Sequence, residues 1–119
     1  AFKHNTKAVY LETIANPVTQ VADLGAIGQF CETKKVLFLV DNTMTPANIF
    51  DANSVLASLT LSSLTKYIAG HGNVLGGVVV DTGLFDWSTF ENILPIYRGP
   101  DKTQWGLTQI RKRGLRDMG

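Results

Sequence analysis

Residues 36–40, Val-Leu-Phe-Leu-Val, form an uninterrupted apolar run between Lys34-Lys35 and Asp41. A short run bounded by charged residues is typical of a strand buried on both faces, and such strands occur in parallel sheets covered by helices. The preceding apolar residues recur at helical spacing and predict a packed helix that ends at the two lysines; they are Val21, Leu24, Ile27, Phe30 and Cys31. A helix followed by a buried strand indicates an α/β layer.

Shorter patterns complete the expected architecture. Residues 7–12 and 56–61 predict two more strands, and residues 75–81 predict another buried strand. A covering helix is expected before Pro95, where apolar residues again recur at helical spacing: Trp87, Phe90, Ile93 and Leu94. Residues 103–113 predict a last helix, with Trp105, Leu107 and Ile110 facing inward. The chain therefore reads as α/β with a mostly parallel sheet.

Length and charge exclude several classes of protein. A chain of 119 residues suits one domain, and its 45% hydrophobic and 18% charged residues are ordinary for a soluble globular protein. The net charge of +1 is too small to gather nucleic acid or an anionic membrane surface, and no apolar run approaches the roughly 18 residues of a membrane span. The single cysteine excludes an internal disulfide, so we expect a cytoplasmic protein.

Polar residues follow two of the predicted strands. Asp41-Asn42-Thr43 comes directly after residues 36–40, and Ser63-Leu64-Thr65-Lys66 follows residues 56–61. In open α/β sheets, ligands bind at the carboxyl ends of strands. This set of groups suits pyridoxal phosphate, because a lysine amine forms a Schiff base with its aldehyde, an aspartate keeps its pyridine nitrogen protonated, and hydroxyls hold its phosphate.

Four segments, in this order, resemble successive motifs of the pyridoxal-phosphate enzymes of cysteine and methionine metabolism. They are Glu-Thr-Ile-Ala-Asn-Pro at 12–17, Val-Asp-Asn-Thr at 40–43, Ser-Leu-Thr-Lys-Tyr at 63–67 and Gly-His-Gly-Asn at 70–73. That family includes cystathionine gamma-synthase, the cystathionine and methionine gamma-lyases, and the O-acylhomoserine sulfhydrylases. Residues 109–116 are also similar to the stretch that leaves the family's cofactor domain, so the resemblance runs over almost the whole chain.

The resemblance implies a fold and a set of roles. The fold is part of the large domain of a fold type I pyridoxal-phosphate transferase, a partial three-layer α/β sandwich. Lys66 is implied as the catalytic Schiff-base lysine, and Asp41 as the partner of the pyridine nitrogen. The remaining implied site residues are Ser63 and Thr65 at the phosphate, Asn16 beside the ring oxygen and the substrate carboxylate, and Glu12 and Thr43 as supports of the cofactor site. No metal is implied.

The implied activity is transsulfuration, by γ-elimination or γ-replacement on sulfur amino acids or O-acylhomoserine. Leu64 and the pair Gly72-Asn73 resemble the synthase and sulfhydrylase members more than the gamma-lyases, which remain an alternative. The substrate is then a small amino acid. Because the family builds each site from two subunits, the intact protein is expected to be a dimer or tetramer.

Family members are roughly three times as long as this chain. We therefore expect residues 1–119 to be part of the cofactor-binding large domain, without the family's N-terminal part or small C-terminal domain, and to be inactive alone. The chain departs from the family pattern at Pro46, Ala52 and the pair Leu56-Ala57, so the loop after Asp41 is expected to differ. A catalytically inactive structural fragment is the main alternative, and an unrelated small binding module is a third.

Three other features have ordinary interpretations. His71 lies between glycines and the only other histidine is His4, so a structural role with the ring bonded to loop backbone is favoured over a general base or metal ligand. Cys31 is expected to be a small core residue rather than a nucleophile. The basic residues Arg111, Lys112, Arg113 and Arg116 fit a solvated or interface helix face better than a nucleic-acid site.

Overall fold

A computed structural model describes residues 2–118 and divides them into two compact units, which meet in sequence between Leu84 and Phe85. The chain length alone predicted a single domain, whereas the structure has two compact units. The first unit holds four strands, one α-helix and one 3-10 turn, and the second holds three 3-10 turns and one α-helix. None of the helices among the described residues is long and apolar enough to span a bilayer.

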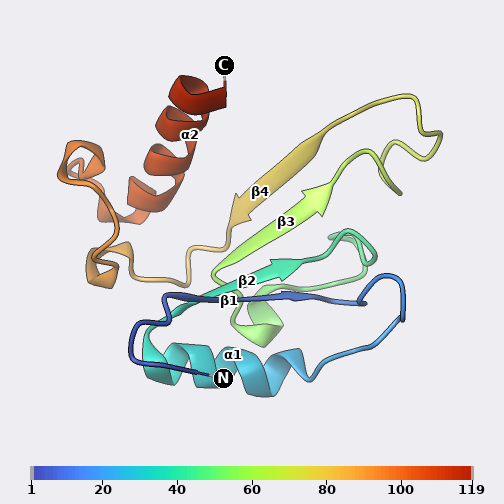
Figure 1. Ribbon diagram of the computed structural model, residues 1–119, viewed down its shortest axis with the longest axis horizontal. Helices are drawn as coiled ribbons and strands as arrows, with labels where there is room; N and C mark the ends of the chain where they lie inside the picture. Colours follow the sequence, from blue (N-terminus) through green and yellow to red (C-terminus); the bar gives the residue numbers. More distant parts are fainter. Residues whose placement is uncertain (1, 119) are drawn as a thin grey trace. The chain divides into compact units, whose positions relative to one another are not determined.

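The first unit is built on a four-stranded sheet of strands β1 (Ala8–Glu12), β2 (Leu37–Asp41), β3 (Leu59–Ser63) and β4 (Gly77–Asp81), in that spatial order. β1 pairs with β2 and β2 with β3 in parallel, whereas β4 runs antiparallel to β3 (Figure 1). The prediction of an α/β fold with a mostly parallel sheet is confirmed. The carboxyl ends of β1, β2 and β3 therefore lie at one edge of the sheet.

Helix α1 (Leu24–Lys34) covers one face of this sheet (Figure 1). It begins at Leu24 rather than Val21, because Oδ1 of Asp23 accepts the Ala26 N–H at 3.0 Å and caps the helix. Val21 lies before the helix and is 73% exposed, so the prediction that it packs is wrong. The helix ends where Lys35 adopts a left-handed conformation with φ 54°.

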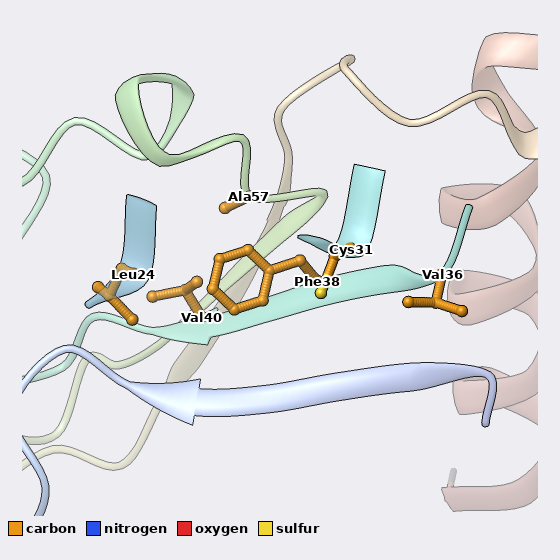
Figure 2. Close-up of a cluster of buried hydrophobic side chains, with 6 residues drawn as sticks. All are labelled: Leu24, Cys31, Val36, Phe38, Val40 and Ala57. Carbon is orange, nitrogen blue, oxygen red and sulfur yellow. The ribbon is translucent and has the colours of Figure 1, made fainter. Parts of the chain in front are cut away.

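The core of the first unit lies between α1 and β2. Because side chains alternate along a strand, Phe38 and Val40 share the face of β2 turned to the helix, and both are completely buried. Figure 2 shows the cluster that they form with Leu24, Cys31, Val36 and Ala57. Cys31 is thus a core residue, as its position on the apolar helix face predicted, and burial raises the pKa of its thiol.

Helix α1 also approaches the 3-10 turn η1 (Asn53–Val55) closely at Gly28. A Cβ built on Gly28 would lie 1.9 Å from the carbonyl oxygen of Val55, which no side chain tolerates. Directly after this turn, Leu56 has a left-handed backbone with φ 58°, so β3 begins at Leu59. The strand predicted at residues 56–61 therefore exists, but it spans Leu59–Ser63.

Strand β4 differs more from its prediction. It starts at Gly77, and its three valines are exposed by 38–48% although their sequence is typical of a buried strand. β4 is the last strand of the sheet and pairs only with β3 among the described residues, which explains the exposure.

The second unit contains the turns η2 (Trp87–Thr89), η3 (Pro95–Tyr97) and η4 (Lys102–Gln104), followed by helix α2 (Trp105–Met118). The covering helix predicted before Pro95 is wrong. Oδ1 of Asp86 accepts the Ser88 N–H at 2.9 Å and starts only one 3-10 turn, after which Phe90 is extended. Trp87 and Ile93 are nevertheless buried, so the apolar spacing predicted their burial correctly although no helix forms.

Helix α2 confirms a helical C-terminal segment but begins two residues later than residue 103 and continues past Arg113. Trp105 and Leu107 are half-buried as expected, whereas Ile110 is 41% exposed, so its inward placement is wrong. The helix starts against the indole ring of Trp87. A Cβ built on Gly106 would lie 2.3 Å from that ring, so glycine allows this contact.

Candidate functional site

A cavity of about 930 Å³ opens at the carboxyl edge of the parallel strands. Glu12, Asp41 and Ser63 are the last residues of β1, β2 and β3, and all three line it. The structure brings all of the predicted site residues to this one cavity, whose full lining is Glu12, Ile14, Asn16, Asp41, Thr43, Met44, Ser63, Thr65, Lys66, Tyr67, Gly70 and Gly72. Segments more than 50 residues apart in sequence thus supply one site.

The carboxylate of Asp41 is held at both of its oxygens. Oδ1 accepts the backbone N–H of Thr43 at 2.9 Å, and Oδ2 accepts the hydroxyl of Tyr10 at 3.0 Å. Partial burial, this hydrogen bond and the negative charges of Asp41 and Glu12 raise the pKa of Tyr10 to about 12. The Tyr10 hydroxyl therefore remains a protonated donor throughout the neutral range.

Thr43 and Asn42 connect the ends of β2 and β3. Oγ1 of Thr43 accepts the Ser63 N–H at 2.8 Å, while Oδ1 of buried Asn42 accepts the Ser62 hydroxyl. Backbone bonding adds to this connection, because the Asn42 N–H binds the Leu61 carbonyl at 2.9 Å. Asp41 and Ser63 are therefore held in a fixed relation to each other.

Glu12 performs a similar task at the end of β1. Its Oε2 accepts the backbone N–H of Asn16 at 2.9 Å and closes the turn that brings Asn16 to the cavity. The backbone N–H of Thr13 binds the Asp41 carbonyl at 2.9 Å, so the end of β1 is attached to the end of β2. Glu12 thus supports the position of Asn16.

The turn after β3 carries Thr65 and Lys66. Oγ1 of Thr65 accepts the Gly76 N–H at 3.0 Å and also donates to the Gly76 carbonyl at 3.3 Å. By contrast, the Ser63 hydroxyl makes no hydrogen bond to any residue between 2 and 118, and the Lys66 ammonium makes no ion pair within the same range. Lys66 is exposed at the cavity. Ser63 and Lys66 therefore present polar groups that are available to a ligand.

Sequence reasoning missed several residues of the site. Tyr10 was recognisable in principle, since it precedes Glu12 by two positions and therefore lies on the same face of β1. Tyr67 and Met44 line the cavity, which Tyr10 does not, and the Tyr67 hydroxyl lies 3.5 Å from the Met44 sulfur. No pattern in the sequence pairs these two. His71 does not line the cavity; its Nδ1 lies 3.2 Å from the Ala69 carbonyl, in agreement with a structural role.

The functional groups around the cavity fit pyridoxal phosphate. An anionic carboxylate, held at both oxygens, matches a protonated ring nitrogen. A lysine without an ion pair among the described residues matches an aldehyde, and the free Ser63 hydroxyl matches a phosphate oxygen. The edge of a parallel sheet that carries this donor set defines the class of a pyridoxal-phosphate-binding α/β protein.

Comparison with known proteins assigns the family. The model of the family described as Cys/Met metabolism PLP-dependent enzyme matches residues 1–115, and the chain belongs to this family. It is 36% identical over 110 residues to O-acetyl-L-homoserine sulfhydrylase of Corynebacterium glutamicum, an alignment that covers 90% of the chain and 25% of that protein. The chain thus spans about a quarter of the length of this curated relative.

Solved structures agree with this assignment. The O-acetylhomoserine sulfhydrylase of Wolinella succinogenes superposes with a TM-score of 0.85 and 36% identity, over 99% of this chain and 33% of that one. An O-acetylhomoserine (thiol)-lyase of Campylobacter jejuni, solved with N'-pyridoxyl-lysine-5'-monophosphate, gives a TM-score of 0.79 at 25% identity, over 99% of this chain and 32% of that one. The chain therefore matches about a third of the length of each of these larger structures.

Proposed function

We propose that this chain forms part of the pyridoxal-phosphate site of a transsulfuration enzyme, of the cystathionine gamma-synthase or homoserine sulfhydrylase type. The substrates would be sulfur amino acids or O-acylhomoserine, and the reaction a γ-elimination or γ-replacement. One observation carries the proposal: every residue that the family resemblance singles out lines a single cavity at the carboxyl edge of the sheet. Relatives named as sulfhydrylases support that type, and relatives named as gamma-lyases keep a gamma-lyase parent as the alternative.

The residues of the cavity divide the work of holding the cofactor. Asp41 would bind the pyridine nitrogen, Ser63 the phosphate, and Asn16 the ring oxygen and the substrate carboxylate. Thr65 would reach the phosphate by giving up its longer bond to the Gly76 carbonyl. When bound, pyridoxal phosphate supplies an electron sink for negative charge at Cα of an amino acid.

Lys66 would have two tasks. Its amine would hold the cofactor through the aldehyde, and a free Lys66 amine would take the proton from Cα of a bound amino acid and return a proton to it. The exposed position of Lys66 beside the cavity, without an ion pair among residues 2–118, leaves its Nζ available for both. Thr43 and Glu12 would act through others, Thr43 by holding Ser63 and Glu12 by holding Asn16.

Residues 1–119 would belong to the large cofactor domain, and the intact protein would act in the cytoplasm as a dimer or tetramer. A second candidate is a structural fragment that binds no cofactor and turns over no substrate.

Borohydride reduction in the presence of pyridoxal phosphate tests the proposal. The chain has seven lysines, and we expect reduction to fix the cofactor mainly on the peptide that contains Lys66. Lys66→Ala should abolish this label, whereas Lys34→Ala on helix α1 should leave it unchanged. Label spread evenly over the lysines, or absent, would favour the structural fragment. A separate assay for amino-acid turnover then decides whether the chain is active alone.

A further inference from the structure

The hydrogen bond between Tyr10 and Asp41 is not explained by any of the roles proposed above. Tyr10 lies on β1 and Asp41 ends β2, 31 residues later in the sequence. The register explains how they meet. Glu12 is the direct partner of Asp41 in the parallel ladder, and Tyr10 lies two residues earlier, on the same face as Glu12. The Tyr10 ring therefore reaches along the sheet toward the Asp41 carboxylate.

The two bonds to Asp41 differ in kind. The Thr43 N–H that binds Oδ1 is main chain and forms a local turn, so it is present in any variant that keeps the fold. Tyr10 is the only side chain among the described residues that donates to this carboxylate, and it binds the other oxygen. A carboxylate held at both oxygens has one orientation about its χ2 torsion. Each oxygen still keeps a second acceptor position for a ligand.

We propose that Tyr10 is a positioning residue for this site: its hydroxyl fixes the Asp41 carboxylate in the orientation that receives the pyridine nitrogen of the cofactor. This assignment rests on the proposed function and adds to it a residue outside the four motifs. Tyr10 itself does not line the cofactor cavity, so it acts through Asp41. The exposed ring, 52% accessible, makes a purely packing role for Tyr10 weak.

A double-mutant cycle on cofactor affinity tests this role. Tyr10→Phe keeps the ring and removes only the hydroxyl, and Asp41→Ala removes its acceptor. We expect Tyr10→Phe to weaken pyridoxal phosphate binding by about five- to tenfold, the size of effect that loss of one ordinary hydrogen bond produces. In the Asp41→Ala background the same change should alter the affinity by less than about twofold, because the hydroxyl then has nothing to position. Tyr97→Phe, at a tyrosine that neither lines the cavity nor binds Asp41, is the matched control.

The outcomes separate the two proposals. If Asp41→Ala leaves the affinity unchanged, or the unmodified chain binds no pyridoxal phosphate, the proposed function fails and this assignment with it. If Asp41→Ala weakens binding but Tyr10→Phe has no effect, or has the same effect in both backgrounds, only the role of Tyr10 is overturned.

A measurement without cofactor checks the contact itself. Carbon NMR of labelled tyrosine follows the ionisation of the Tyr10 phenol, whose pKa is raised to about 12 from 10.0 by partial burial and by the carboxylates of Asp41 and Glu12. In Asp41→Ala this pKa should fall toward 10.0 but stay above it, since burial and Glu12 remain. A Tyr10 pKa that is the same in both proteins would show that the two side chains do not meet in solution and would overturn the proposal.

Discussion

Oγ1 of Thr43 accepts the backbone N–H of Ser63 at 2.8 Å, and this bond joins the ends of two neighbouring parallel strands. Thr43 lies two residues after Asp41, which ends β2, and Ser63 is the last residue of β3. We propose the Asp41 carboxylate for the ring nitrogen of the cofactor and the Ser63 hydroxyl for its phosphate. The Thr43 side chain fixes the spacing between these two groups and need not touch the cofactor itself.

Thr43→Val should therefore weaken both the fold and the site. Valine has the shape of threonine without the hydroxyl, so the half-buried Ser63 N–H loses its acceptor, at a cost of about 1–2 kcal/mol in the free energy of unfolding. Cofactor affinity should fall by several-fold, and Thr43→Ser should restore both. Urea unfolding and cofactor titration measure the two effects.

The control is Thr33→Val on helix α1, where the lost bond is to the exposed carbonyl of Gln29. This change should stay within about 0.5 kcal/mol. Equal effects at Thr43 and Thr33 would contradict the bridging role.

Ser63→Ala and Thr65→Val should separate binding from stability. The Ser63 hydroxyl has no partner among the described residues, so its loss should change the free energy of unfolding by less than about 0.5 kcal/mol while weakening cofactor binding. The Thr65 hydroxyl holds Gly76 by two bonds, so Thr65→Val should also cost about 1 kcal/mol of stability. Equal losses of stability in Ser63→Ala and Thr65→Val would contradict this difference between the two hydroxyls.

The site was more predictable from sequence than the elements around it, for a physical reason. Asp41 follows an unbroken apolar run, and a buried parallel strand must deliver its last polar residue to the sheet edge where ligands bind. The position of Ser63 follows in the same way, although β3 starts three residues later than its pattern predicts. Local apolar pattern and motif order are enough for such positions.

Other features depend on contacts that no local pattern records. Tyr10 meets Asp41 only through the register of β1 on β2, and the left-handed Leu56 ends a 3-10 turn where apolar spacing predicts strand. Trp87 and Ile93 are buried without forming a helix, because the turn capped by Asp86 stops after one turn. At Trp87 and Ile93, apolar spacing therefore predicted burial correctly and the backbone wrongly, whereas at Val21 and Ile110 it predicted burial that the structure does not show.

Gly28→Ala should destabilise the first unit strongly. The new Cβ would meet the Val55 carbonyl oxygen at 1.9 Å, so helix α1 and turn η1 must separate, at a cost of about 3 kcal/mol, typical of overpacking. Gly25→Ala lies on the same helix, where the nearest atom is a side-chain oxygen of Asp23 at 3.6 Å, and should leave stability unchanged or raise it by up to about 1 kcal/mol. Thermal unfolding followed by circular dichroism compares the pair, and a similar melting temperature for both would refute the close contact.

Cys31 should react slowly with iodoacetamide at neutral pH. Its thiol is buried, and burial raises its pKa, so both access and the thiolate fraction are low. Reaction should become fast in urea, when the core opens. Rapid labelling of the folded chain, followed by mass spectrometry, would contradict the packing of Cys31 against Phe38 and Val40.

The most direct measurement is a crystal structure of the chain soaked with pyridoxal phosphate. The account predicts electron density continuous from the Lys66 Nζ to the cofactor, with the pyridine nitrogen on Asp41 and the phosphate on Ser63. Cofactor bound to another lysine, or density confined to a surface away from the carboxyl edge of β1, β2 and β3, would contradict it.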